Sequence, residues 1–349
     1  MNKSNLPASI WFFGLIALSG IACAQTSPTH GPDWPDWAYG ELVPLSPQSR
    51  LAPPCPAGSQ PFDCAYKETP VAENGVKRTL PGSDRSFTRN ETYYDYEPAD
   101  WYPQDHPSMP SFVARGKQGV KLRPCALCHY PNGQGRAENA QLAGLPATYI
   151  VQQLNAFTAA TRRSADKRKA NANEMAMIAT HLNDEEKQQA AEYFSSMPFR
   201  QMIRVVEASE VPQVRPTTNG LMVPIKDLPL VPLGKRILLV PENPERVLTT
   251  RDPRALWLAY APMGSLASGE KLVMTVNDKT MQCSLCHGAD LKGLADIPSI
   301  VGRTPTYAMR QLWDFKQGSR QNPLMKAVVD HLSAEELLQI SAYLASLQP

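Results

Sequence analysis

The sequence predicts a mainly α-helical protein that contains two copies of one domain, an irregular proline-rich extension before them and a small β insert between them. Three observations support this prediction: an internal repeat, many prolines before residue 110, and short β-type runs between the copies. The repeat is clearest in two pentapeptides, Cys125–His129 and Cys283–His287, which lie 158 positions apart.

The same spacing holds beyond the pentapeptides. It relates Gly144 to Gly302, Tyr149 to Tyr307, Gln153 to Gln311, Leu154 to Leu312, Phe157 to Phe315 and Arg162 to Arg320. Farther along, the spacing becomes 150 and pairs Met175 with Met325 and His181 with His331. The first copy therefore carries eight extra residues between Arg162 and Met175.

The repeat and the composition around it predict five parts. They are a signal peptide at 1–24, an extension rich in proline and aromatic residues at 25–110, a first domain at 111–198, a β-rich insert at 199–262 and a second domain at 263–349.

Helices are expected at matching places in both copies. Runs from Ser111 to about Gly119 and from Ser268 to about Val276 precede the pentapeptides. Pro146 and Pro305 can each open a longer helix, because proline suits the first helical turn. The last helix of each copy begins with a capping box, Asn183 with Glu186 and Ser333 with Glu336.

The insert and the extension differ from the copies in composition. Four short runs of the insert are of β type, Ile203–Val206, Leu221–Pro224, Arg236–Val240 and Ala255–Tyr260. Prolines at their edges favour a small antiparallel sheet or a pair of hairpins. The extension holds 15 prolines, which exclude a helix bundle, and its many aromatic residues favour an ordered irregular wrap over a disordered tail. Partner docking is an alternative use for it.

The N-terminal residues predict export. Lys3, the apolar run Ile10–Ile21 and the small residues Ala22–Ala24 match a secretory signal that is cleaved before Gln25. A membrane anchor and a lipoprotein acylated on Cys23 are the alternatives. The localisation expected from the signal is periplasmic.

In an oxidising compartment the two spare cysteines, Cys55 and Cys64, are expected to form a disulfide. The net charge is small, with 35 Lys and Arg against 33 Asp and Glu, so the sequence implies no general affinity for nucleic acid or membrane surfaces. The run Arg162–Lys169 is strongly basic, which suits either docking of an acidic partner or a solvated loop.

Both pentapeptides read C-x-x-C-H, the pattern that attaches haem c covalently. Two thiols bond to the porphyrin, and the following imidazole ligates the iron. The motifs therefore predict two covalent haem c groups, bound by Cys125, Cys128, Cys283 and Cys286. His129 and His287 are the predicted iron ligands. A zinc half-site or a thioredoxin-like redox pair is the alternative interpretation.

Each iron needs a sixth ligand, and methionine is the usual one in an electron carrier. Met175 and Met325 each lie eight residues before the cap of the last helix, which makes them the predicted pair. Met177 is the rival in the first copy. His181 and His331 also match, but they lie beside the helix cap and are interpreted as structural.

The sequence resembles the dihaem cytochrome c4 family of class I cytochromes c. The features that carry the resemblance are the two motifs, the Tyr-x3-Gln-Leu-x2-Phe helix, the methionine and the capped last helix. The resemblance covers about 111–198 and 263–349 and implies two tandem class I cytochrome c domains, His/Met ligation and electron transfer. It also implies that a proline carbonyl accepts the hydrogen bond of the iron-ligating His. Pro298 stands at that place in the second copy, whereas Ala140 replaces it in the first.

The expected function is single-electron transfer between protein redox partners, a donor and an acceptor such as a dehydrogenase or a terminal oxidase, with no bond chemistry of its own. Two alternatives remain open: an electron-accepting subunit docked to a dehydrogenase, and a dihaem enzyme of the thiosulfate dehydrogenase or peroxidase type. In the thiosulfate dehydrogenase case Cys55 or Cys64 would ligate an iron. Arg162 and Arg320 are candidates for contacts with haem propionates, because the guanidinium fork suits a carboxylate.

Overall fold

The computed structural model describes residues 33–39, 75–217, 221–276 and 278–349. Contacts between residues divide the chain into two units, Met1–Trp34 and Pro35–Pro349. The described residues are mainly helical with a few short strands, which confirms the predicted fold class. The predicted signal peptide and the cysteines Cys55 and Cys64 lie outside the described residues, so cleavage, acylation and the disulfide stay predictions. The five-part division stays a prediction as well.

The first copy folds as short helices around one apolar core. Its elements are α3 (Ser111–Arg115), η4 (Gln118–Val120), α4 (Cys125–His129), α5 (Ala147–Thr158), α6 (Ala170–Thr180) and α7 (Asp184–Ser195). Helix α5 contacts both α6 and α7. Leu154 and Phe157 of α5 and Phe194 of α7 belong to this core. Residues three and four positions apart share one face of a helix, so a single apolar face of α5 meets both neighbours.

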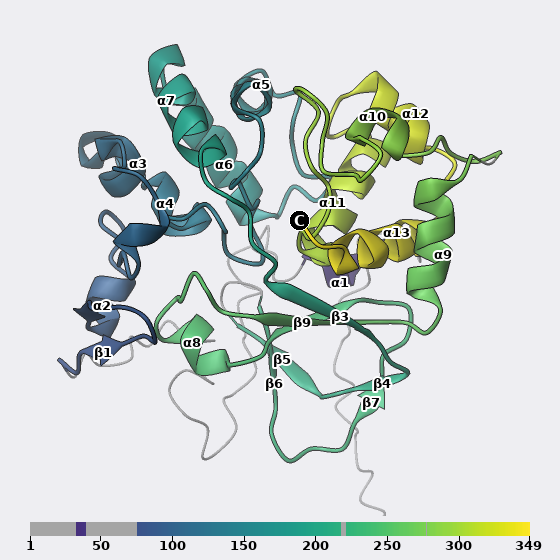
Figure 1. The fold of residues 1–349 in the computed structure, drawn as a ribbon, viewed down its shortest axis with the longest axis horizontal. Helices are drawn as coiled ribbons and strands as arrows, with labels where there is room; N and C mark the ends of the chain where they lie inside the picture. The colour runs from purple at the N-terminus through teal and green to yellow at the C-terminus, as the bar shows by residue number, and fades with distance from the viewer. Residues whose placement is uncertain (1–32, 40–74, 218–220, 277) are drawn as a thin grey trace, which may run out of the picture. The chain divides into compact units, whose positions relative to one another are not determined.

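The second copy repeats the pattern. It contains α9 (Ser265–Met274), α10 (Ser284–His287), α11 (Pro305–Lys316), α12 (Pro323–Val329) and α13 (Ala334–Ser346). Helix α13 contacts α9 and α11, and the three lie together in Figure 1. Gly269 permits the close crossing of α9 and α13, because a Cβ there would lie 2.2 Å from the carbonyl oxygen of Gln339.

Sequence signals set the ends of these helices as predicted. Asn183 with Glu186 and Ser333 with Glu336 form complete capping boxes. The eight extra residues of the first copy change one helix start. Helix α6 begins five residues before Met175, whereas α12 begins only two residues before Met325.

The insert contains small sheets at the four predicted runs, but their pairing corrects one expectation. The largest sheet has the order β3 (Ile203–Glu207), β9 (Trp257–Ala261), β8 (Leu238–Pro241), and β3 pairs with β9 in parallel (Figure 1). The local sequence patterns predicted an antiparallel arrangement. Such patterns contain no information about the relative direction of β3 and β9, which lie at opposite ends of the insert and run in the same direction.

Shorter elements complete the insert. They are the antiparallel pairs β4 (Glu210–Val211) with β7 (Val231–Pro232) and β5 (Val214–Pro216) with β6 (Met222–Pro224), and helix α8 (Pro244–Leu248). Leu338 and Ala342 of α13 join Ile203 and Trp257 in one apolar cluster. The insert is therefore packed on the second copy through the same helix that closes that copy's bundle.

The described part of the extension is irregular, as predicted, with very short elements. These are α1 (Asp36–Tyr39), β1 (Arg78–Thr79), β2 (Ser86–Phe87), α2 (Arg89–Thr92) and η3 (Pro103–Asp105). Trp101 is buried, and its Nε1 donates to the Thr250 carbonyl of the insert at 2.7 Å. Within the described residues, none of the helices is both long and apolar enough for a membrane span.

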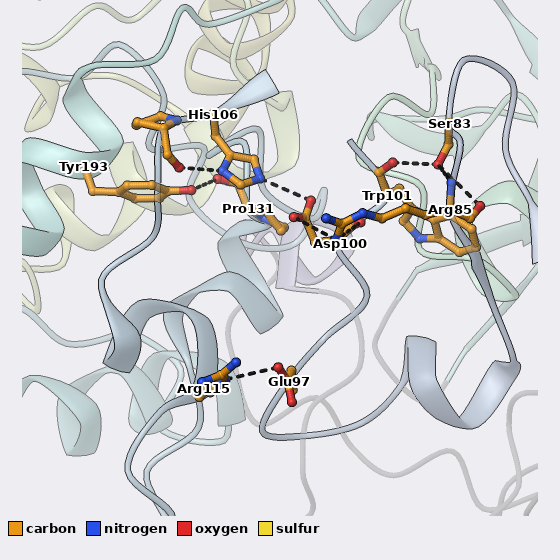
Figure 2. A network of polar contacts seen from close by, with 10 residues as sticks. Ser83, Arg85, Glu97, Asp100, Trp101, His106, Arg115, Pro131 and Tyr193 are labelled. Atoms are coloured by element: carbon orange, nitrogen blue, oxygen red, sulfur yellow. Dashed lines mark hydrogen bonds and ion pairs between the residues drawn. The ribbon is translucent and has the colours of Figure 1, made fainter. Parts of the chain in front are cut away.

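Figure 2 shows how the extension approaches the first copy. His106 Nε2 lies 3.1 Å from Asp100 Oδ1, and the His106 ring lies edge-on to Tyr193 of α7 at 6.2 Å between centroids. The Tyr193 hydroxyl donates to the Pro131 carbonyl at 2.5 Å, two residues after the first pentapeptide. The extension thus contacts the tyrosine that binds the backbone just after the first attachment motif.

Candidate functional site

The first candidate site is a cavity between α4 and α6. Cys125, Cys128 and His129 line it from α4, and Met175 lines it from α6. Side chains of α5 form a further wall, and four residues of α11 reach the cavity from the second copy: Tyr307, Arg310, Gln311 and Asp314. The structure therefore brings the predicted attachment and iron-ligand residues of the first copy together.

The histidine of each motif is held in one tautomer. His129 Nδ1 lies 2.7 Å from the Ala140 carbonyl oxygen, and His287 Nδ1 lies 2.8 Å from that of Pro298. A carbonyl oxygen only accepts, so Nδ1 carries the proton and Nε2 is left to ligate a metal. Burial lowers the pKa of His129 to about 4, which keeps the imidazole in the neutral form that a ligand needs.

Backbone geometry explains why Ala140 can replace proline. The hydrogen bond uses a carbonyl oxygen, which every residue carries, and the two distances differ by only 0.1 Å. The contact implied by the resemblance is thus present in both copies.

The structure also separates the two candidate methionines of the first copy. Met175 is partly buried and lines the cavity, whereas Met177 is exposed and does not line it. The Met177 carbonyl accepts from His181 Nδ1 at 2.9 Å. His181 and His331 are both exposed, and His181 is not among the residues that line the cavity.

The predicted residues of the second site differ from one another in burial. His287 is buried and Met325 is partly buried, while Cys286 is exposed. Asn322 caps α12 by accepting from the Met325 backbone N–H at 3.0 Å, which fixes the turn that carries the methionine.

The cysteine environments do not suit a thioredoxin-like pair. Burial raises the pKa of the Cys125 thiol to about 12 and that of Cys283 to about 11. A redox-active C-x-x-C pair works through a thiolate with a lowered pKa. Partly buried, protonated thiols at Cys125 and Cys283, each close in sequence to a buried histidine, agree with attachment to a hydrophobic group.

A polar network joins the two copies. Arg162 donates to Gln153 of its own copy at 2.9 Å and to Tyr307 and Gln311 of the other copy, both at 3.0 Å. Arg320 donates to Gln311 of its own copy at 3.0 Å and, in the opposite direction, to Tyr149 and Gln153, both at 2.8 Å. The side chains of the repeat thus cross the interface with a twofold-like symmetry.

The network carries more positive than negative charge. Burial opposes ionisation of the Tyr149 phenol, yet the charges of Arg320 and Arg162 outweigh it and lower its pKa. Burial lowers the pKa of Arg303 to about 10, and Arg303 Nε has no hydrogen-bond partner among the described residues. Buried guanidinium groups of this kind need anions nearby.

Haem fits these observations. Each haem carries two propionate carboxylates, and Arg162 and Arg310 line the first cavity together with the attachment motif. Arg162 and Arg310 would therefore be within the first site to bind haem carboxylates, whereas Arg303 does not line this cavity. Arg162 and Arg320 could be found from the sequence because they match in the two copies. Arg303 and Arg310 could not, because Leu145 and Gln152 stand at their positions in the first copy.

The structure contradicts both interpretations of the basic run Arg162–Lys169, a solvated loop and a docking surface. Arg162, Asp166 and Lys169 are buried, and Lys169 Nζ donates to the Tyr39 carbonyl at 2.6 Å. Asp166 also pairs with Arg168 at 2.6 Å. Most of this run thus packs between elements and is neither a solvated loop nor a docking surface.

Comparisons with known proteins agree with this site. The family model described as cytochrome c matches residues 113–198. Cytochrome c-554(548) of Halomonas halodenitrificans is 34% identical over 87 residues, which is 24% of this chain and 96% of that protein. Cytochrome c4 of Azotobacter vinelandii is 24% identical over 250 residues, or 69% of this chain and 91% of that protein.

A third relative is the thiosulfate dehydrogenase electron acceptor of Stutzerimonas stutzeri, which is 36% identical over 94 residues, or 26% of this chain. The chain spans 44% of this relative's length, and 31% and 62% of two others. Because a small cytochrome is matched over nearly its whole length, and both motifs are present, the chain belongs to the cytochrome c family, whose members transfer electrons through covalently bound haem c.

Proposed function

We propose that this protein is a periplasmic dihaem cytochrome c that carries single electrons between redox partners through a relay of two haems. The observation that carries the proposal is the pairing of two matched attachment sites through the Arg162 and Arg320 network. Four side chains of α11 in the second copy line the first site, so the interface between the copies is also a wall of that site.

The residues of each site would have separate tasks. Cys125, Cys128, Cys283 and Cys286 would bond the two haems, and His129 and His287 would ligate iron through Nε2. Met175 and Met325 would be the sixth ligands. Haem would supply the redox chemistry, while the protein would hold the ligands and place Arg162 and Arg310 beside the first haem.

Methionine at both sixth positions would favour a carrier over an enzyme. A thioether there would leave no site for a substrate on the iron and would stabilise the ferrous form. In the peroxidase and thiosulfate dehydrogenase alternatives one iron would be open or bound to a cysteine. Cys55 and Cys64 lie outside the described residues, so the second case stays open to experiment.

The test is a haem count on exported protein. Mass spectrometry should show two haem additions on a chain that starts near Gln25, and replacing Cys283 and Cys286 together with Ala should remove one of them. A single addition in the unmodified protein contradicts the relay, and an acylated Cys23 contradicts the soluble form.

A docked subunit is the second candidate, because relatives include a thiosulfate dehydrogenase electron acceptor and the cytochrome subunit of a sulfide dehydrogenase. In that case the extension would hold a dehydrogenase. Stable co-purification of the exported protein with a dehydrogenase supports this candidate, whereas a monomer that exchanges electrons on its own supports the carrier.

A further inference from the structure

An ion pair joins the first attachment motif to the helix that carries Met175. Arg123 lies two residues before the motif, and Glu174 is the residue just before Met175 on α6. The contact is bidentate, since Arg123 Nε donates to Oε1 of Glu174 at 2.6 Å and Nη2 donates to Oε2. Both side chains line the first cavity. Asp95 of the extension contacts the same guanidinium at 3.4 Å.

A second polar contact joins the start of α6 to the other end of the motif. Asn171 Nδ2 donates to Asn139 Oδ1 at 2.7 Å, and Asn139 Nδ2 donates to the Cys128 carbonyl at 3.4 Å. Asn171 lies four residues before Met175, about one helical turn. The turn of α6 that leads to the methionine is therefore bonded to both ends of the motif.

Apolar residues occupy the same positions in the second copy. Met281 lies two residues before the second motif, and Leu324 directly precedes Met325. Ile297 stands where the first copy has Asn139, each ten residues after the histidine of its motif. None of these side chains carries a charge or a hydrogen-bond donor, so the second copy can form neither contact.

The second copy has a neutral hydrogen bond in the corresponding region. The Thr280 hydroxyl donates to the Val328 carbonyl of α12 at 2.8 Å, three residues after Met325. A hydrogen bond between neutral groups is weaker than a bidentate contact between ions. The segment around Met325 is therefore held to its motif by weaker contacts than the segment around Met175.

The motif to which α6 is bonded is itself covered. Leu127 of the first motif is 2% exposed, and Arg251 of the insert donates through Nη2 to its carbonyl. The Arg251 guanidinium lies 5.2 Å from the centroid of the Tyr93 ring of the extension. Leu285, at the same place in the second motif, is 64% exposed. The insert and the extension thus cover the motif that anchors α6.

We propose that Arg123 and Glu174 are positioning residues that keep Met175 in place as the sixth ligand of the first haem iron. A ligand that the chain already holds in its bound position loses little freedom on binding, so a competing ligand displaces it less easily. This inference rests on the proposed function, in which Met175 ligates the iron, and it adds the residues that retain the ligand there.

The ion pair suits positioning better than general stabilisation. The side chains of Arg123 and Glu174 are 37% and 22% exposed, and ion pairs that water reaches contribute little to the free energy of unfolding. The bidentate contact, however, fixes the direction of the guanidinium relative to the carboxylate. Replacing the two residues with Met and Leu, as in the second copy, removes one cation and one anion. The net charge stays the same, so a weaker hold on Met175 would result from position and not from charge.

The experiment adds imidazole, a competing iron ligand, to the oxidised dihaem protein and follows the weak red-edge absorption band that a sulfur ligand produces. Met325→Ala serves as the background, so that the band reports Met175 alone. Arg123→Met together with Glu174→Leu should lower the imidazole concentration that removes half of the band about fivefold, as the loss of a partly exposed charged pair implies. Arg123→Lys keeps the charge without the fork and should give a smaller decrease.

The matched control is Arg115→Met together with Glu97→Leu. This variant removes another ion pair between the first copy and the extension, at 3.1 Å, and neither residue lines the cavity. The imidazole concentration should not change in the control. Amide hydrogen exchange gives a second measurement, because α6 should exchange faster in the Arg123 and Glu174 double variant while α7 should not.

Two results would overturn the proposal. One is an unchanged imidazole concentration in the double variant, and the other is an equal decrease in the control, which would show that the loss of any ion pair loosens the site. If the double variant does not fold with haem, Arg123→Lys decides, and an unchanged imidazole concentration there rejects the positioning role.

The background variant separates this proposal from the proposed function. A red-edge band that persists in Met325→Ala, with no effect of the double variant, would leave Met175 as the ligand and reject only the positioning role. Absence of the band in Met325→Ala would show that Met175 is not the ligand, which contradicts the ligation on which the proposed function depends.

Discussion

The guanidinium groups of Arg162 and Arg320 cross the interface between the two copies in opposite directions, and each binds a glutamine of its own copy together with a tyrosine and a glutamine of the other. The backbone reinforces this exchange, since Arg163 N–H donates to the Ser319 carbonyl and Gln321 N–H to the Thr161 carbonyl, both at 2.8 Å. The two copies are therefore joined at the elements that also wall the first haem site.

Removing one arginine should weaken the interface and change the redox potential. Arg162→Gln should lower the free energy of unfolding by about 1–3 kcal/mol, because buried partners lose their donor. It should also lower the potential of the first haem, because a nearby positive charge favours ferrous iron. Arg162→Lys keeps the charge and should retain most of the potential while still losing stability. Denaturant unfolding and voltammetry measure the two effects, and equal potentials for the Gln and Lys variants would contradict the electrostatic role.

The choice between Met175 and Met177 can be tested by the weak red-edge absorption band of oxidised haem that arises from a sulfur ligand. Met175→Ala should remove about half of the band and lower the potential of one haem, because the thioether that favours ferrous iron is lost. Met177→Ala is the matched control and should leave the band intact, since that side chain is exposed and does not line the cavity. The reverse pattern would make Met177 the ligand.

The cover over the first motif should be visible in amide hydrogen exchange. Arg251→Ala removes the hydrogen bond to the Leu127 carbonyl and the contact with Tyr93. Exchange across α4 should rise about tenfold or more, in line with the loss of one buried hydrogen bond. Helix α10 is the internal control in the same sample and should not change. Unaltered exchange in α4 would show that the insert does not protect the motif.

The contact between His106 and Asp100 predicts a pH dependence of stability. Burial alone would lower the pKa of His106, but hydrogen bonds to Asp100 and to the Pro107 carbonyl outweigh it and raise the pKa above 6.5. The charged form is thus favoured in the folded protein. Its stabilising effect is fully present below about pH 6.5 and is lost as the pH rises through the higher pKa of the folded state.

Urea unfolding between about pH 5 and pH 9 should therefore show a decline in stability that His106→Gln reduces. Asp100→Asn should reduce the same decline, because it removes the hydrogen-bonding carboxylate. A decline of unchanged size in both variants would assign the pH dependence to other groups.

Local chemistry explains which features were predictable from the sequence. Helix starts depend on residues within one helical turn. The structure contains the capping boxes of α7 and α13, and it has proline just before α5 and at the first position of α11. The parallel pairing of β3 with β9 was not predictable in this way, because it joins strands that are far apart along the chain. The burial of the basic run Arg162–Lys169 was missed for the same reason, since its contacts come from α1 and α11.

By itself, the sequence determined the two attachment motifs, the repeat that relates their ligands and the mainly helical fold. Covalent attachment and helix caps depend on fixed short spacings, so pattern alone is sufficient for them. Only the tertiary structure decided which methionine of the first copy lines the cavity, how Arg162 and Arg320 exchange partners, and why Leu127 is covered while Leu285 is exposed. These properties depend on which distant segments pack against a residue, and two copies with the same motif can therefore have different surroundings.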